Sequence, residues 1–449
     1  MTASAPTADP SSAGTGLGKG SPARSLIQGG LILTIAQTVA SGGNYALNLA
    51  FGRLLSPHEF ADASLMVTLM MLASSLALGL QLMTARAVAL SRGSRAEDTP
   101  ETTRAAADMI SRLTRWSFAA GTVVGLIFAV GAPIWQELLN TGSPWPFILL
   151  GLGMPWYLAQ SVGRGQLQGR LRFGPLALSF IVEMIVRVGL SVTLVAFGLG
   201  VSGAALGLGV SFVATWVSVR YYVGHPAPIL STRADPRLRG YAAQISVLLI
   251  GQIIANESDI LVAKHYLTDN TAARYAAVAL VGRAVFFLTW SVAITMFPVA
   301  ARRQADGDVP DRLLLGGALA VLGLGLACTA GAAVLGGPVL KMVLGPHYAG
   351  LSAPLSGYAF GTTLLAVANL IASHHLAAGV TRQSWALLGG AVLYTAAMLV
   401  WHGSIAQLVT TQIFSMALLL AATLSIGHLR LPTWNRRVQT VPLQRKSPR

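Results

Sequence analysis

The stretch from Ala255 to Arg283, ANESDILVAKHYLTDNTAARYAAVALVGR, decides how the rest of the chain is interpreted. It joins the end of one apolar segment to the start of the next. Glu257 and Asp259 lie near the end of the first segment, and Arg283 lies well inside the second. Ionisable groups at such depth in a membrane are unfavourable unless they face each other or a wet cavity, so they mark candidate transport pathways. We therefore expect the remaining segments to form the scaffold of a pathway.

The composition is that of an integral membrane protein. Hydrophobic residues make up 53% of the chain and charged residues only 10%, whereas about a quarter of the residues in a soluble domain are charged. Apolar runs of about 20 residues, each long enough to cross a bilayer as a helix, recur along the chain. The predicted fold is an all-α polytopic membrane protein with twelve spans: Leu26–Phe51, Asp62–Ala89, Arg115–Leu138, Pro144–Val162, Gly174–Gly198, Val201–Tyr222, Tyr241–Tyr266, Ala272–Ala300, Leu313–Gly336, Gly350–Ala377, Ser384–Trp401 and Ile405–His428.

The positive charges predict the orientation of these spans. Of the 31 Lys and Arg residues, 25 fall in segments on the side of the N-terminus and four on the opposite side, while Arg187 and Arg283 lie inside spans. Short loops rich in Lys and Arg remain in the cytoplasm. Both termini are therefore expected in the cytoplasm. Because the charges are scattered over short loops, the net charge of +15 does not indicate a nucleic-acid partner.

Three segments without apolar runs divide the chain. Residues 1–24, rich in Ser, Ala, Gly, Thr and Pro, are predicted to be a disordered cytoplasmic tail. Residues 224–240 contain three prolines and are predicted to be a cytoplasmic linker between an N-lobe at 25–223 and a C-lobe at 241–428. Residues 429–449 form a basic cytoplasmic tail that we expect to lie against anionic lipid headgroups.

An internal repeat supports the division into two lobes. When the chain is shifted by roughly 212 residues, NYALNLAFGRLLSPHEFADAS from Asn44 lies over NESDILVAKHYLTDNTAARYAA from Asn256. A comparable shift places LQGRLRFGPLAL from Leu167 over AAGVTRQSWALL from Ala377. Because each half holds six spans, an even number, the lobes should be related by a pseudo-two-fold axis along the membrane normal. We expect a cavity between them.

These junctions resemble those of the polysaccharide-exporting flippases in the multidrug, oligosaccharidyl-lipid and polysaccharide exporter superfamily. The stretch NLAFGRLLSPHEFADASLMV after the first span is similar to the Gly-Arg-Leu-Leu-x-Pro-x-Glu-Phe turn of that family. The segment NESDILVAKHYL with Asp259, the FPVAA ending of the eighth span and LQGRLRFGPLAL also fit. The resemblance covers roughly residues 25 to 428.

The resemblance implies a V-shaped pair of lobes that opens alternately to each leaflet of a bacterial plasma membrane. Such a protein moves a polyprenyl-diphosphate-linked glycan for polysaccharide or cell-envelope biosynthesis and is not an enzyme. A monomer is expected, with glycan-assembly proteins as partners. The first, second, seventh and eighth spans line the central cavity of the family. The substrate-binding candidates on these four spans are Arg283, Asn44, Asn48, Gln81 and Asn256. Two further candidates, Arg187 and Asn369, lie on other spans.

The chemistry of lipid flipping gives these residues a role. A diphosphate must be hidden from hydrocarbon, and the fork of donors on Arg283 suits phosphate oxygens. An ion pair between Arg283 and Glu257 or Asp259 is the alternative, and the two roles stay open. Glu257 and Asp259 are two residues apart, so they do not share a helical face.

Coupling to a cation is the role expected of these carboxylates. Asn256 with one carboxylate would supply part of a sodium shell, and a poorly solvated carboxylate would bind a proton. Alternatively, Asp259 lies at the headgroup boundary. No metal or cofactor is expected apart from such a coupled Na⁺ or H⁺.

A second pair of charges lies in the fifth span. Glu183 and Arg187 are four residues apart on one helical face, in the order that favours an ion pair. We favour a structural pair. If that face turns inward, Arg187 becomes a second phosphate contact.

Other functions fit the sequence less well. An ion-coupled drug exporter of the same superfamily would favour carboxylates and aromatics over an arginine such as Arg283. A lipid II flippase is a closer alternative. A membrane glycosyltransferase or glycan polymerase needs room outside the bilayer, whereas the outer connections are only about five to fifteen residues long. A major facilitator carrier would show a Gly-x-x-x-Asp-Arg-x-Gly-Arg-like loop after the second span, and ALSRGSRAEDTPETTR does not match it.

Overall fold

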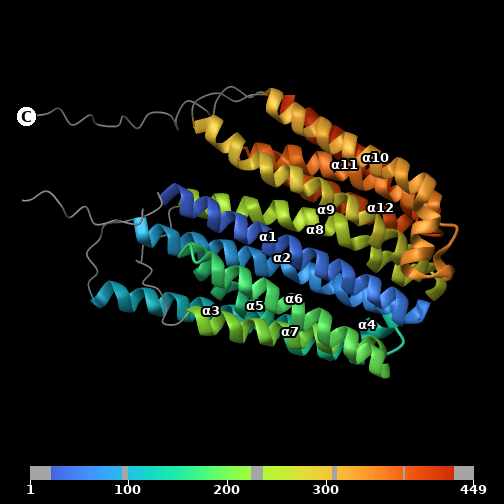
Figure 1. Ribbon diagram of the computed structural model, residues 1–449, viewed down its shortest axis with the longest axis horizontal. Coiled ribbons are helices and arrows are strands. Elements are labelled where there is room, and N and C mark those ends of the chain that lie inside the picture. Colours follow the sequence, from blue (N-terminus) through green and yellow to red (C-terminus); the bar gives the residue numbers. More distant parts are fainter. Residues whose placement is uncertain (1–21, 94–99, 224–235, 306–310, 378–379, 429–449) are drawn as a thin grey trace, which may run out of the picture.

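A computed structural model describes residues 22–93, 100–223, 236–305, 311–377 and 380–428. These residues are almost entirely helical, and no strand occurs among them. The all-α prediction is therefore confirmed (Figure 1). The helices are α1 Pro22–Leu54, α2 Pro57–Gly93, α3 Pro100–Val130, α4 Ala132–Leu138, α5 Trp145–Gly169, α6 Phe173–Leu194, α7 Gly200–Val223, α8 Pro236–Tyr266, α9 Asp269–Ala305, α10 Asp311–Leu344, α11 Ser352–Ala377, α12 Arg382–Val400 and α13 Ile405–His428.

The helices account for the twelve expected spans. Within the described part of the chain, nine stretches are long and apolar enough to cross a membrane. One of them, Phe173–Val223, comprises both α6 and α7. These two helices meet at a tight turn in which Gly198 and Gly200 have φ values of +87° and +52°, a conformation that glycine adopts without steric penalty. Helices α1 and α5 coincide with the other two expected spans but are not among these nine stretches.

Packing confirms the two lobes. In the first half, α5 packs against α2, α3 and α7, and α6 packs against α1 and α7. In the second half, α11 packs against α9, α10 and α13, and α12 packs against α8 and α13. Matching α1, α2, α3, α5, α6 and α7 in order with α8 to α13 maps each pair onto its counterpart. The repeat therefore extends from the sequence to the arrangement of whole helices.

Several element bounds differ from the sequence prediction. Helix α1 begins at Pro22 and α8 at Pro236, so short parts of the expected tail and linker are helical. The remainder of the linker, residues 224–235, and the expected tails at 1–21 and 429–449 lie outside the described residues. The third span divides into α3 and α4, because Pro133 lies in the first turn of α4 and cannot donate a hydrogen bond to the preceding turn.

The two lobes meet unequally along their seam. Helix α2 packs along α8 and also against α9. The symmetric counterpart of the α2–α8 pair is α1 with α9, which makes only slight contact. We call the end of the molecule where α1 meets α2 at residues 54–57 the turn end, and the end where α7 finishes at Val223 the linker end. The seam is therefore tight on one side and loosely packed on the other.

Candidate functional site

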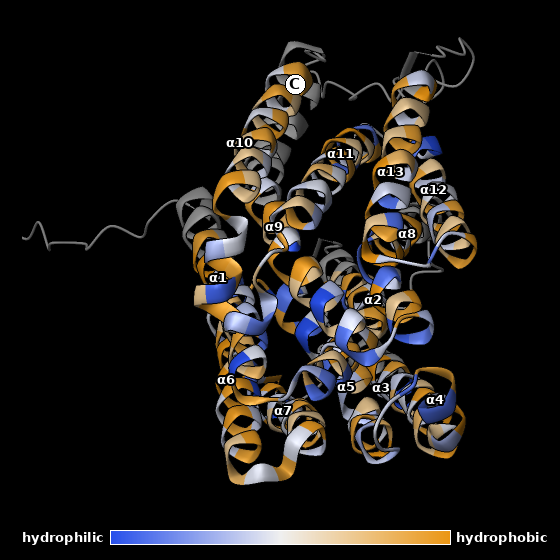
Figure 2. Ribbon diagram, turned by 90° about the vertical axis from the view of Figure 1, so that its right-hand side faces the viewer, coloured by the Kyte–Doolittle hydropathy of each residue, from blue (hydrophilic) through white to orange (hydrophobic). Residues whose placement is uncertain are grey.

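A pocket lies in the seam between the lobes. Its volume is about 100 Å³, and α1, α2, α8 and α9 all contribute side chains to it. Hydrophilic segments gather near α1, α2 and α8, while most of the outer helical surface is hydrophobic (Figure 2). This seam pocket is lined by Ser41, Asn44, Tyr45, Asn48, Ser64, Val67, Thr68, Met71, Glu257, Ile260, Ala276, Leu280, Arg283 and Phe287.

The guanidinium of Arg283 lies at one wall of the seam pocket and binds both neighbouring carboxylates. Its Nη1 is 2.9 Å from Oε2 of Glu257, and its Nη2 is 2.5 Å from Oδ1 of Asp259. Nε donates to the hydroxyl of Tyr358 at 3.1 Å. The ion pair that the sequence left open is therefore formed, with both acids at once. Two carboxylates facing one guanidinium leave an excess of negative charge when both are ionised.

The two carboxylates occupy different surroundings, as expected from their spacing. Glu257 lines the seam pocket and accepts a hydrogen bond of 3.1 Å from Thr68 on α2, which belongs to the other lobe. Asp259 is only 1% exposed and accepts hydrogen bonds from Tyr275 at 3.1 Å and Tyr358 at 2.8 Å inside the C-lobe. Its carboxylate is therefore enclosed by protein. Glu257 is thus the member of the pair that a ligand in the pocket meets.

Arg187 lies inside the N-lobe, away from the seam pocket lining. It forms an ion pair with Glu183, whose other oxygen is 2.6 Å from Nη2 of Arg164. Nη1 of Arg187 donates to Oδ1 of Asn44 at 2.9 Å. All three charged side chains are at least nine-tenths buried. The geometry favours the structural reading of the Glu183–Arg187 pair, and Asn44 is the link between this cluster and the pocket.

Arg164 corrects the sequence interpretation. We expected the fourth span to end at Val162 and placed Arg164 in a cytoplasmic connection, but α5 continues to Gly169. The guanidinium is buried because Ser179 and Glu183 on α6 satisfy it: Nε donates to Oγ of Ser179 at 3.0 Å. Two arginines facing one glutamate give this cluster an excess of positive charge.

The four remaining amide candidates are divided between the pocket and the lobe interiors. Asn48 lines the seam pocket, and its amide donates to the carbonyl of Asn44 at 2.9 Å. Gln81 donates to Oε1 of Gln168 at 2.9 Å and is not part of the pocket lining. Asn256 is half-buried on α8 outside the lining.

Asn369 is 1% exposed within the C-lobe, on α11. Its side-chain oxygen has no hydrogen-bond partner, and it is not part of the seam pocket lining. Thr68, Tyr275 and Tyr358 were missed by sequence reasoning. Tyrosines within an apolar span, rather than at its edge, were the available signal, because a buried hydroxyl requires a partner.

A second group of interlobe contacts closes the turn end. Lys264, whose side chain is 2% exposed, lies 2.7 Å from Oδ1 of Asp62 on α2 and 2.9 Å from Oδ1 of Asp269 on α9. We counted Lys264 only as one of the four positive charges on the outer side, and the structure buries it in the last turn of α8. Arg53 on α1 donates to the carbonyl of Val343 on α10 at 2.6 Å.

Aromatic packing reinforces this closure. Phe60 on α2 and Tyr348, which follows α10, meet edge to face with ring centroids 5.8 Å apart. Burial raises the pKa of the Tyr348 hydroxyl to about 12. The tyrosine therefore contributes an uncharged contact at physiological pH, and the ion pairs of Lys264 supply the charged part of the closure.

No group of three or more His, Cys, Asp or Glu residues that could hold a metal ion occurs in the described ranges. Glu257 and Asp259 together carry more negative charge than Arg283 neutralises. They offer carboxylate oxygens to a proton or a sodium ion rather than a complete metal shell.

Comparison with known proteins identifies the fold and the family. A family described as "Polysaccharide biosynthesis protein" matches residues 50–353. An inward-facing multidrug resistance MATE family transporter of the MOP superfamily gives a TM-score of 0.69 at 15% identity, covering 89% of this chain and 98% of that one. The lipid II flippase MurJ in an inward closed conformation gives 0.69 at 11% identity, covering 88% and 87%. No curated protein sequence matches the chain significantly.

We expect Lys264→Met to destabilise the protein strongly, because it leaves Asp62 buried without its ion-pair partner. Removing one partner of a buried pair costs about 3–5 kcal/mol. Combining Lys264→Met with Asp62→Asn should recover much of that loss. The measurement is the thermal unfolding midpoint of the detergent-solubilised protein.

Lys341→Met is the matched control, since Lys341 is an exposed lysine at the turn end of α10. It should leave the midpoint nearly unchanged. Equal midpoints for Lys264→Met and Lys341→Met would contradict the assignment of Lys264 to the closure between the lobes.

Proposed function

From the premise that the chain belongs to the polysaccharide biosynthesis protein family, we propose that it is an alternating-access flippase for a polyprenyl-diphosphate-linked glycan in the bacterial plasma membrane. The observation that carries this proposal is the placement of Arg283. Its guanidinium is half-buried at the wall of a pocket to which both lobes contribute. A cation between two lobes that move relative to each other can bind an anionic headgroup during its passage.

The loose side of the seam supports a lipid substrate. Helices α1 and α9 barely touch, whereas α2 and α8 pack closely. Phe287 of α9 lines the seam pocket and is 54% exposed, which supports an opening toward lipid between α1 and α9. A prenyl tail can stay in the bilayer there while the diphosphate and sugars enter the polar pocket. A water-soluble substrate would have no need of such an opening.

The contacts of Arg283 imply a switch between two partners. In this structure both of its Nη atoms bind carboxylates, so its charge is already neutralised. A diphosphate approaching Glu257 meets an excess of negative charge unless that carboxylate takes up a proton or a sodium ion. Neutralising Glu257 releases Nη1 of Arg283 for phosphate oxygens, while Asp259 and Tyr358 continue to orient the guanidinium. Cation uptake and substrate binding are thereby coupled.

Arg187, which belongs to the positively charged cluster of the N-lobe, is the candidate for a second phosphate contact in this cycle. Asn44 both lines the seam pocket and accepts a hydrogen bond from Arg187. A displacement of α1 would remove Asn44 and open the buried guanidinium to the pocket. Arg187 then becomes a second phosphate contact in a later step of the cycle.

The closed turn end gives the direction of the cycle. By the charge distribution along the sequence, the turn end faces outward and the linker end faces the cytoplasm. Lys264 and Arg53 hold the lobes together on the outer side. In the proposed cycle, this closed outer end would belong to a state that awaits substrate from the inner leaflet, and opening of these contacts would release the glycan outside.

An ion-coupled multidrug exporter is the second candidate function. The excess of negative charge around Arg283 favours a cationic compound over an anionic one when both carboxylates are ionised. A lipid II flippase shares the diphosphate chemistry of the first candidate. Binding of a prenyl diphosphate to the purified protein, compared with binding of a lipophilic cation, distinguishes the drug exporter from both flippases.

Arg283→Ala should abolish glycan export, because it removes the only cation among the residues that line the seam pocket. Export is measured as surface polysaccharide in cells that depend on this protein. Arg283→Lys, which keeps the charge without the fork of donors, should retain a small fraction of it. Adding Glu257→Gln to Arg283→Ala removes one of the two carboxylates left without a counter-ion and should recover part of the stability without restoring export.

Arg274→Ala is the matched control on the same helix. Arg274 contacts only the carbonyl of Ala349, at 3.5 Å, and the variant should export normally. Wild-type export by a well-expressed Arg283→Ala variant would remove Arg283 from the substrate pathway and with it the proposed function.

Glu257→Gln should make transport insensitive to the coupling cation, since a glutamine cannot change charge. In proteoliposomes, transport by the wild-type protein should respond to a sodium gradient, a pH gradient or membrane potential. Glu137→Gln, at an exposed position on α4, should keep the wild-type response. Transport by the wild-type protein that ignored all three driving forces would exclude the coupling role of Glu257.

A further inference from the structure

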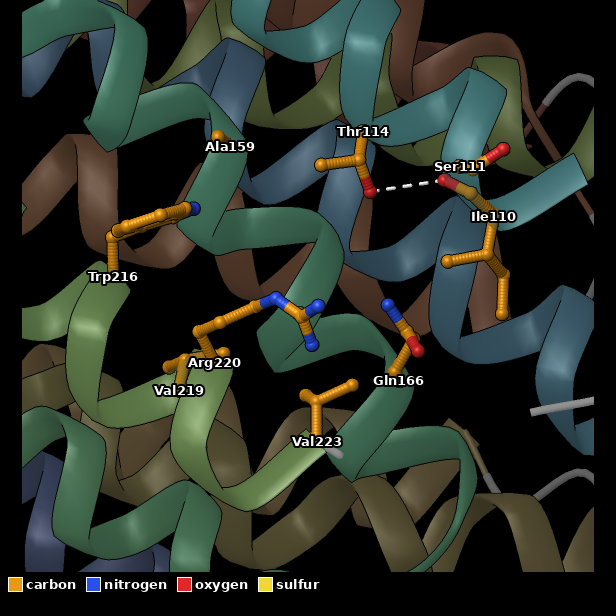
Figure 3. A pocket seen from close by; sticks show the side chains of 10 residues that line it. Ile110, Ser111, Thr114, Ala159, Gln166, Trp216, Val219, Arg220 and Val223 are labelled. Atoms are coloured by element: carbon orange, nitrogen blue, oxygen red, sulfur yellow. Dashed lines mark hydrogen bonds between the residues drawn. The ribbon is translucent and has the colours of Figure 1, made fainter. Parts of the chain in front are cut away.

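A second cavity lies in the N-lobe, separate from the seam. It occupies about 230 Å³ between α3 and α7, with α5 as its floor (Figure 3). Helices α3 and α7 each pack along α5, but they are not packed against each other. The cavity is therefore a groove over α5, between two helices of the N-lobe. The groove residues are Ile110, Ser111, Thr114, Ala159, Gly163, Gln166, Trp216, Val219, Arg220 and Val223.

The groove changes from polar to apolar along its length. Arg220 lies near the linker end of α7, which finishes at Val223. Trp216 lies one helical turn earlier, which places it about 6 Å deeper along the helix. Ala159, two turns before Gln166 on α5, lines the same deeper part (Figure 3). The groove thus has a charged residue at one end and an aromatic, apolar lining deeper inside. This arrangement suits the charged headgroup and the acyl chain of a phospholipid better than it suits a soluble metabolite.

Gln166 supplies independent evidence for a ligand. Its side chain lines the groove and is only 4% exposed, yet its Oε1 has no hydrogen-bond partner. A buried acceptor without a partner loses about 1–3 kcal/mol of stability. A hydroxyl group entering the groove from the linker end would donate to this oxygen. Figure 3 shows the side chains of Arg220 and Gln166 in the same part of the groove.

The charge around the groove mouth favours an anion. The carbonyl groups at the end of α7 would repel a phosphate, but two arginines already bind them. Arg170 donates to the carbonyl of Val223 at 2.8 Å, and Arg172 donates to that of Tyr222 at 2.7 Å. Their charges compensate the negative end of the helix. Arg220 carries five donors, enough to bind phosphate oxygens in addition to its contacts within the protein.

We propose that this groove is a binding site for one anionic phospholipid with a hydroxylated headgroup, of the phosphatidylglycerol type. The phosphodiester binds Arg220, a headgroup hydroxyl donates to Oε1 of Gln166, and one acyl chain lies along Trp216 and Ala159. The site is independent of the transport pathway, because none of its residues lines the seam pocket. It anchors α3 and α7 to each other through the lipid, where they lack direct packing.

Quenching of tryptophan fluorescence tests the proposal directly. The purified full-length protein is reconstituted in phosphatidylcholine with increasing amounts of phosphatidylglycerol brominated on the acyl chains, or of brominated phosphatidylcholine. The same titrations with Trp216→Phe, subtracted from those with the wild-type protein, isolate the quenching of Trp216. We expect brominated phosphatidylglycerol to quench Trp216 at a concentration about fivefold lower than brominated phosphatidylcholine, as one favourable charge contact provides.

Three variants separate the site from general effects of charge. Arg220→Gln and Gln166→Leu should each reduce the preference for phosphatidylglycerol. Arg382→Gln should keep it, because Arg382 is an exposed arginine at the start of α12, in the other lobe. Each variant is used only when it elutes as the wild-type protein does on size exclusion. Equal quenching by the two brominated lipids, or an unchanged preference in Arg220→Gln, would overturn the proposal.

Discussion

The ion pairs of Arg283 with Glu257 and Asp259 are the constraint on which the rest of the structure depends. A lone guanidinium at this depth in a bilayer would be strongly unfavourable. Two carboxylates on α8, two tyrosines and the polar pocket make its position tolerable. The same contacts place the arginine at the boundary between the lobes, since Glu257 also binds Thr68 of the opposite lobe. The chemistry of the site and the closure of the seam are therefore linked through one side chain.

The seam between the lobes is asymmetric both in its packing and in its charge. The lobes repeat each other helix by helix, yet α2 packs on α8 while α1 and α9 scarcely touch. Charges are distributed just as unequally: the N-lobe cluster of Arg164, Arg187 and Glu183 has an excess of positive charge, and the cluster at Arg283 has an excess of negative charge. Under the proposed function, an anionic headgroup would be repelled by the cluster at Arg283 until a cation binds there, and would be attracted by the N-lobe cluster. A symmetric scaffold with unlike charges suits a carrier that must release what it binds.

Much of this arrangement could be predicted from the sequence. The twelve spans follow from apolar runs, and the repeat follows from the match of Asn44 with Asn256, because both depend on local patterns. The spacing of two residues between Glu257 and Asp259 predicted that they do not share a helical face, but not which of them lines the pocket. Arg164 was placed wrongly in a loop, and Lys264 was counted only as a charge on the outer side. Each lies near the end of an apolar run, and only the partners from distant helices, Glu183 for one and Asp62 for the other, show that it is buried. The tyrosines around Asp259 were missed for the same reason.

The most direct test of the central claim is to measure, by native mass spectrometry, the binding of a prenyl diphosphate to the purified protein. If Arg283 exchanges a carboxylate for a phosphate, the diphosphate should bind more tightly to Glu257→Gln than to the wild-type protein, and a neutral prenyl alcohol should show no such difference. Equal binding of the diphosphate and the alcohol to both proteins would contradict the account.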